Sequence, residues 1–196
     1  LAAYQLAEGL YPKNLEVLTG LAWLLHGQGL DDRALPLLRR AAAIHPNNGS
    51  ANLGLAEILA ANGDLAGAED CYRRALAAPE WAGHPGVLRG FAEVLSARQK
   101  SPEAAGVIAQ ALAKDPSAQP LLSAAHIERR SGGKEAAYRR LFEALAGDPS
   151  RDEALLQRAL WLLEDGRLDE AAADADALLA RGDGPLARWV RGSVRA

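Results

Sequence analysis

Alanines recur along this chain at a nearly fixed interval. Successive members of the first series are spaced by 34, 36, 33 and 34 residues, and they are Ala22, Ala56, Ala92, Ala125 and Ala159. A second alanine follows twelve residues after each member, and a third follows seven residues later in every copy but the last, which has Leu178. Small residues kept at three positions indicate close approach of packed elements, because larger side chains would overpack such contacts. A period of this length is typical of repeat architectures.

Helix breakers divide each copy into two short segments. Glycine lies midway through three copies, in Gly29-Leu30-Asp31, Gly63-Asp64-Leu65 and Gly166-Arg167-Leu168. At these places glycine can end one helix and aspartate can begin the next. Between the breakers, apolar residues recur at helical spacing over segments of about 12 to 15 residues. Alanine is abundant and β-branched residues are few, which favours helix over strand. The sequence therefore predicts an all-α fold of a dozen short helices.

The pattern is clearest in QGLDDRALPLLRRAAAIHPNN (28–48), NGDLAGAEDCYRRALAAP (62–79) and EDGRLDEAAADADALLARGD (164–183). These segments resemble second helices of the tetratricopeptide repeat family, whose 34-residue helix-turn-helix unit has small residues at three positions and a proline near its end. Here Pro46, Pro116 and Pro149 match that proline. Glu128 and Arg158 depart from the family, which usually has an apolar residue there. Together with richness in alanine and arginine, the resemblance indicates a bacterial protein.

The resemblance implies a right-handed α-α superhelix, a solenoid of about five full repeats with a half repeat at each end. Residues 1–14 would be the second helix of a preceding repeat, and residues 185–196 a terminal or capping helix. The full repeats are expected at 15–48, 49–84, 85–117, 118–151 and 152–184.

In the resembled family, the first helix of each repeat lines a concave groove that binds partners. The residues of this chain at the matching positions include Glu16, Thr19, Trp23, His26, Leu53, Glu57, Arg89, Glu93, His126, Arg129 and Arg130. Trp23 is the expected anchor, since a large aromatic residue offers much contact area at low entropic cost; the alternative is that Trp23 packs between repeats. Arg89, Arg129 and Arg130 could hold a carboxylate or an acidic segment, or they could form a solvated face.

Other classes of function find little support in the sequence. The net charge of −3 and the pI near 5.8 argue against a nucleic-acid surface, and no apolar run approaches the length of a membrane span. The four histidines show no metal-ligand spacing, and the lone Cys71 is expected to pack as a small hydrophobe. The Lys/Asn pairs with which related domains hold chaperone tails are absent. We therefore expect no enzyme activity, no cofactor, no metal, no nucleic acid and no membrane insertion.

Two functions remain open. The first is a non-catalytic scaffold that binds a peptide or protein segment in the groove. The second is a repeat module of a larger enzyme or secretion machine, such as a glycosyltransferase, a sulfotransferase or an exopolysaccharide export protein, which mediates substrate recruitment or oligomerisation. The absence of Met and the ends in mid-repeat favour a piece of a longer protein. Homo-oligomerisation through the solenoid ends is also open, because such ends carry unpaired apolar faces. A cytoplasmic location is slightly favoured over a periplasmic one.

The stretch ALAAPEWAGHPGVL (75–88) gathers Trp81 and His84 but lies between two repeats. The spacing of 36 residues places two extra residues in this junction. Pro85 is expected to open the next helix, where its missing N–H is not needed. Trp81 is expected to be partly buried against the flanking helices rather than to belong to an active site.

Overall fold

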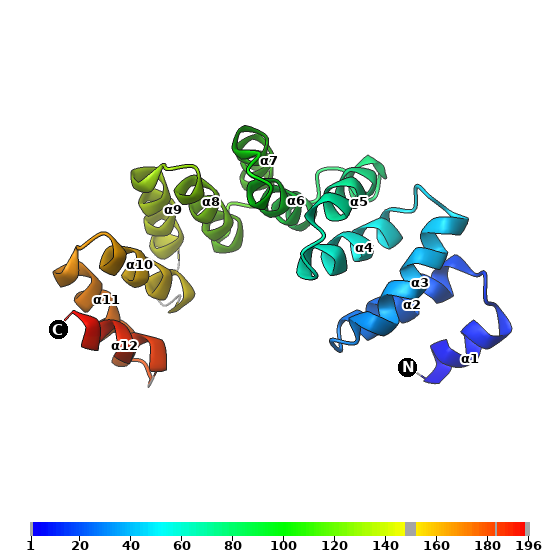
Figure 1. Ribbon diagram of the computed structural model, residues 1–196, viewed down its shortest axis with the longest axis horizontal. Helices are drawn as coiled ribbons and strands as arrows, with labels where there is room; N and C mark the ends of the chain where they lie inside the picture. The colour runs from blue at the N-terminus through cyan, green and yellow to red at the C-terminus, as the bar shows by residue number, and fades with distance from the viewer. Residues whose placement is uncertain (1, 148–151, 183, 195–196) are drawn as a thin grey trace. The chain divides into compact units, whose positions relative to one another are not determined.

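The computed structural model describes residues 2–147, 152–182 and 184–194, and within them the chain forms helices joined by short turns (Figure 1). In chain order the helices are α1 (Ala2–Leu10), α2 (Leu15–His26), α3 (Asp31–Ile44), α4 (Gly49–Ala61), α5 (Leu65–Ala77), α6 (Pro85–Ala97), α7 (Ser101–Lys114), α8 (Ala118–Arg130), α9 (Lys134–Gly147), α10 (Asp152–Glu164), α11 (Leu168–Leu179) and α12 (Pro185–Ser193). The predicted all-α helical-repeat fold is confirmed. Pro149, expected to end the fourth repeat, lies outside the described residues.

Contacts group the helices into two compact units. The N-terminal unit, Leu1–Asp115, holds α1 to α7, and the C-terminal unit, Pro116–Ala196, holds α8 to α12. Within the N-terminal unit, the helices pack in the pairs α2–α3, α4–α5 and α6–α7, and each pair packs on the next. The C-terminal unit contains the pairs α8–α9 and α10–α11, with α12 packed against α10 and α11.

The repeated alanines lie in the buried interior of the helix array. All five members of the first series, from Ala22 to Ala159, are 0% exposed, and so are the five that follow twelve residues later. In the third series, Ala41, Ala75 and Ala111 are 0% exposed and Ala144 is 1% exposed, whereas Leu178 of the last copy is 9% exposed. The alanine spacing therefore marks fully buried positions, where a larger side chain would have to displace packed neighbours.

Glycine shapes the turns within the pairs. Gly29, Gly63 and Gly166 have φ values of 71°, 82° and 75°, in the left-handed region that glycine enters without a steric cost. Asp64 then caps α5, since its carboxylate accepts a hydrogen bond from the Gly67 N–H at 3.0 Å. In the α6–α7 turn the left-handed residue is Gln99, with a φ of 62°.

The irregular junction between α5 and α6 is packed rather than open. Trp81 is half-buried, as expected. Its indole lies over Gly49 at the start of α4, so closely that a Cβ at position 49 would collide with the ring. Pro85 stands in the first turn of α6, also as expected. The Trp81–His84 pair is thus part of a helix joint.

Polar pairs replace apolar contacts at the two atypical positions of the C-terminal unit. Arg158 on α10 donates two hydrogen bonds to Asp174 on α11, with Nε–Oδ2 and Nη2–Oδ1 distances of 2.8 and 2.7 Å. Glu128 on α8 accepts from Arg140 on α9, at 3.2 Å between Oε1 and Nε. Each pair joins the two helices of one helix pair, so that a charge in the packed layer is met by an opposite charge.

Candidate partner-binding face of the first helices

Trp23 is the central aromatic side chain on the first helices of the N-terminal unit. It is half-buried on α2, and its Cζ2 atom would lie 3.5 Å from a Cβ added at Gly54 on α4. The indole therefore packs against α4 at Gly54, although the side chain that a Cβ there would crowd is Leu38 rather than Trp23. The His26 ring meets the indole edge-on, with 5.7 Å between ring centroids, a geometry that aromatic pairs favour. Trp23 packs between α2 and α4 and still exposes part of its ring.

His26 joins Trp23 to a line of carboxylates. Its Nδ1 atom lies 2.6 Å from Asp31 Oδ1, and its Nε2 atom lies 3.4 Å from Glu57 Oε2. Burial raises the pKa of Glu57, while the charges of His26 and Arg89 act in the opposite direction. The imidazole thus links the start of α3 to the middle of α4.

Arg89 and Glu93 continue this line on α6. Arg89 Nη1 donates to Glu93 Oε1 at 2.9 Å. Tyr72 of α5 packs beneath them, since a Cβ at Gly90 would collide with its hydroxyl group. Burial raises the pKa of the Tyr72 phenol, and the charges of Glu57 and Glu93 raise it further. Tyr72 therefore keeps its proton at neutral pH. The sequence pattern does not predict that Tyr72 supports α6 beneath Arg89 and Glu93, because this support depends on its contact with Gly90 in the folded chain.

Three other residues expected on this face differ in their exposure and hydrogen bonding. Glu16 is exposed in the first turn of α2. The Thr19 hydroxyl donates to the Leu15 carbonyl at 2.8 Å and thus serves its own helix. Leu53 is 5% exposed, so it belongs to the packed interior and offers little surface to a partner. We call the set Trp23, His26, Glu57, Arg89 and Glu93 the Trp23 face.

In the C-terminal unit, Arg129 is tied into an internal network. Its Nη1 atom donates to Asp165 Oδ2 at 2.9 Å, and Nη2 donates to Glu164 Oε2 at 3.0 Å. The guanidinium carbon lies 4.9 Å from the centroid of the Trp161 ring, and the side chain is only 15% exposed. Its neighbour Arg130 is exposed at the end of α8. The hypothesis that Arg129 holds a partner's carboxylate is therefore not favoured, because carboxylates of its own unit already bind it.

Asp165 is the centre of that network, and no motif in the sequence singles it out. Besides Arg129, its carboxylate accepts from Lys134 Nζ at 2.6 Å and from the Tyr138 hydroxyl at 2.9 Å. The hydrogen bonds from Arg129 and Lys134 hold the pKa of Asp165 well below its usual range. The hydrogen bond to Asp165 also contributes, after burial, to raising the pKa of Tyr138 to about 12. His126, exposed on α8, stands edge-on to Trp161 with 5.1 Å between centroids.

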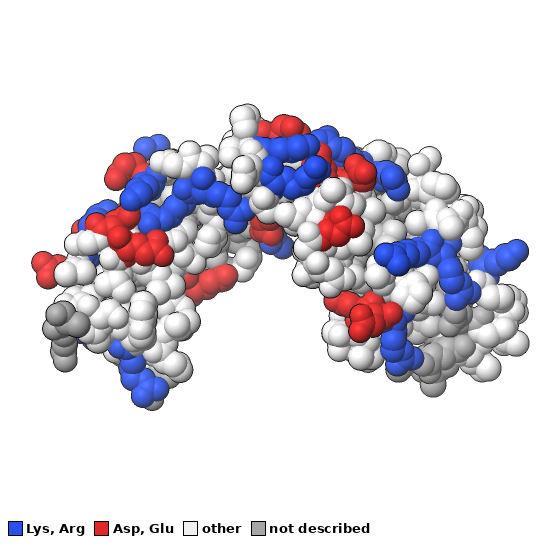
Figure 2. Space-filling model, in the orientation of Figure 1, with Lys and Arg blue, Asp and Glu red and all other residues white. Residues whose placement is uncertain are grey.

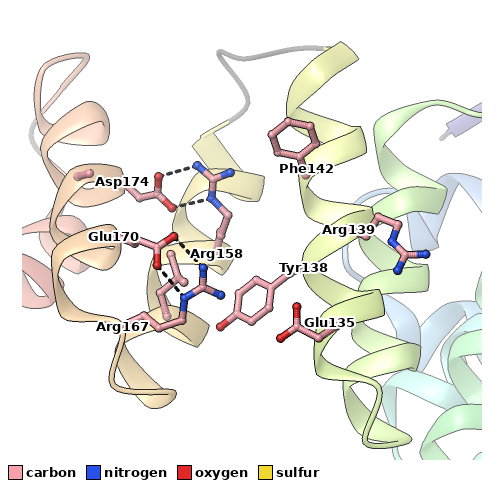
Figure 3. Close-up of a pocket in the computed structure, with 10 residues that line it drawn as sticks. Glu135, Tyr138, Arg139, Phe142, Arg158, Arg167, Glu170 and Asp174 are labelled. Atoms are coloured by element: carbon pink, nitrogen blue, oxygen red, sulfur yellow. Dashed lines mark hydrogen bonds and ion pairs between the residues drawn. The ribbon is translucent and has the colours of Figure 1, made fainter.

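A pocket of about 600 Å³ opens between α9 and α11, with α10 contributing part of its lining (Figure 3). Figure 3 shows two arginine–carboxylate pairs on one side and the Tyr138 ring between the two helices. Arg167 donates to Glu170 with distances of 2.8 and 2.7 Å, and Arg158 binds Asp174. Phe142, at the other side, is 66% exposed. With Arg139 and Glu135 also in the lining, guanidinium and carboxylate groups balance, so neither sign of charge prevails that would select a ligand.

Charged residues of both signs are interleaved on the visible face of the molecule (Figure 2). Among the described residues, no group of three or more His, Cys, Asp or Glu side chains is placed to hold a metal ion. Cys71 is buried, and burial raises the pKa of its thiol. None of the helices in the described ranges is long and apolar enough to cross a bilayer.

Comparison with known proteins agrees with the repeat spacing. A model of the tetratricopeptide repeat matches residues 32–80. A tetratricopeptide repeat protein from Parabacteroides merdae has a similar structure, with a TM-score of 0.83 and 20% identity over 99% of this chain and 77% of that one. A thermophilic repeat protein from Thermus thermophilus gives a TM-score of 0.72 and 23% identity, covering 93% of this chain and 99% of that one.

PilF from Pseudomonas aeruginosa also gives a TM-score of 0.72, with 19% identity over 92% of this chain and 88% of that one. Identities this low show a shared fold and carry no function across. Comparison with curated proteins found no match. The resemblance to tetratricopeptide repeats is confirmed by the match at residues 32–80 and by these structures.

Proposed function

Because this chain has the tetratricopeptide repeat fold and matches that family over residues 32–80, we propose that it is a non-catalytic scaffold that binds a segment of a partner protein on the Trp23 face. Proteins of this family generally bind proteins or peptides and rarely act as catalysts.

One observation carries the proposal: a half-buried Trp23 contacts α4 at Gly54 and packs against His26, which in turn contacts Glu57. Such an arrangement has the features of a binding hot spot. A large, fixed aromatic ring supplies apolar contact area, and hydrogen-bonding groups around it can set the orientation of a partner. Because neighbouring helices fix the indole, little side-chain entropy would be lost on binding.

The test selects peptides from a displayed library on the whole protein and measures their affinity for Trp23→Ala. Truncating a hot-spot residue costs about 2 kcal/mol, so we expect dissociation constants to rise about 30-fold. Trp189→Ala is the matched control, since Trp189 is 58% exposed on α12 of the other unit. Circular dichroism of each variant verifies that the fold is retained. Equal affinity for wild type and Trp23→Ala would refute the Trp23 face as the binding site.

A further inference from the structure

The first helices of the N-terminal unit are poor in basic residues. Together α2, α4 and α6 contain three carboxylates, Glu16, Glu57 and Glu93, against one guanidinium, Arg89, and one imidazole, His26. No lysine occurs in these three helices. The face that they share is therefore acidic, although basic residues are common elsewhere in the chain.

Pairing within the unit leaves this imbalance in place. Arg89 is hydrogen-bonded to Glu93, so these two charges offset each other, and the carboxylates of Glu16 and Glu57 remain in excess. Asp31 at the start of α3 adds a further carboxylate, 2.6 Å from His26. The side chains of Asp31, Glu57 and Glu93 remain 34%, 38% and 45% exposed. These carboxylates can therefore be reached by a partner's side chain.

Glu57 has the most to gain from an added cation. It lies between His26 and Arg89, and burial still raises its pKa despite both neighbours. A raised pKa means that the surroundings do not fully compensate the negative charge. A lysine or arginine brought beside Glu57 would supply that compensation.

We propose that the segment bound by the Trp23 face is basic, with Lys or Arg side chains that pair with Glu57 and Glu93 and stack on the Trp23 ring. This inference rests on the proposed function and specifies its partner. Trp is the aromatic residue that holds cations best, and the His26 ring that packs on Trp23 contacts the carboxylates of Asp31 and Glu57. An acidic segment would instead meet like charges, which disfavours binding.

The experiment compares two synthetic pools of random decapeptides that differ only at three fixed positions, which are Lys in one pool and Glu in the other. Each pool is passed over immobilised wild-type protein, Trp23→Ala, and the double variant Glu57→Gln/Glu93→Gln. Glu80→Gln is the matched control, because Glu80 is an exposed glutamate of the same unit outside the face.

We expect wild type and Glu80→Gln to retain the Lys pool in preference to the Glu pool. Retention should fall about fivefold in the double Gln variant, as expected for losing about 1 kcal/mol of ion pairing. Raising NaCl from about 0.05 to about 0.5 M should weaken it further, because salt screens exposed charges. Circular dichroism shows whether each variant stays folded.

The other outcomes are distinguishable. Binding that depends on Trp23 but favours the Glu pool, or that ignores the double Gln substitution, overturns the basic partner and leaves the proposed function standing. Absence of any binding that depends on Trp23, in either pool, overturns both.

Discussion

Gln99 is unusual among the described residues other than glycine, since it alone has a positive φ, at 62°. The equivalent turns between paired helices contain Gly29, Gly63, Gly132 and Gly166, all with positive φ. A side chain in the left-handed region crowds its own backbone, at a cost of about 1 to 2 kcal/mol. The α6–α7 turn therefore carries a strain that its counterparts avoid.

Replacing Gln99 by glycine should stabilise the protein. Relief of the strain exceeds the extra entropy that glycine gains in the unfolded chain, which leaves a net gain of about 0.5 to 1 kcal/mol. Thermal unfolding should then shift upward by about 2 °C. Gln99→Ala is the control, because alanine keeps the Cβ and its strain. A melting temperature that is equal in both variants would show that the turn is not strained.

Buried small residues could be predicted from the sequence, whereas the partners of charged residues could not. The small contact positions could be read from the sequence because close packing leaves alanine little alternative, as Ala56 and Ala125 illustrate at 0% exposure. The partners of charged residues could not be read in this way. Arg129 matches a groove position in the repeat, yet Asp165, 36 residues later, holds it. Such pairing depends on side-chain reach across helices, which a repeat alignment does not contain.

One buried carboxylate joins α5 to the turn between α6 and α7. Glu69 of α5 is 4% exposed. It accepts hydrogen bonds from Arg73 Nη2 and Lys100 Nζ, each at 2.8 Å, and from Arg98. Burial by itself would raise the pKa of Glu69, but these cations lower it to about 2. Arg98 ends α6 and Lys100 precedes α7, so Glu69 fixes the turn between them.

Glu69→Gln should destabilise the protein by about 2 kcal/mol at pH 7, because a buried ionic network loses its anion. The pKa of Glu69 is lower in the folded state than its ordinary value of 4.5. Its contribution is therefore full above about pH 4.5 and is lost as pH falls towards 2. Urea unfolding between pH 7 and 3 should show the gap between wild type and variant closing.

Glu103→Gln is the control for this series. Glu103 also pairs with Arg73, but its side chain is 52% exposed, and exposed pairs contribute about 0 to 1 kcal/mol. A gap between wild type and Glu69→Gln that stayed constant with pH would contradict an ionised Glu69 in the folded protein.

At the scale of the whole molecule, the helices of each compact unit pack mainly against other helices of the same unit. Residues 1–115 include α1 to α7, and α6, for example, has both neighbouring helices, α5 and α7, inside this unit. In repeat proteins, stability is built from contacts between adjacent elements. The N-terminal unit thus has the interior that independent folding requires.

A fragment of residues 1–115 should therefore fold, with a helical circular dichroism spectrum and a cooperative thermal transition. A fragment ending at residue 97 is the matched control: it lacks α7 and Lys100, so it uncovers the buried face of α6 and removes a partner of Glu69. We expect its melting temperature to be lower by several degrees. A fragment 1–115 without a cooperative transition would show that the N-terminal unit needs the rest of the chain.

The polar pairs of the C-terminal unit determine which helices can be replaced without leaving a buried charge unpaired. Arg158 and Asp174 come from the two helices of one pair, as do Glu128 and Arg140. Swapping α10 for the first helix of another repeat would leave Asp174, 6% exposed, without its cation. Moving α10 and α11 together would keep both charges matched. In evolution and in protein engineering, these repeats should therefore be inherited or grafted as complete hairpins, never as single helices.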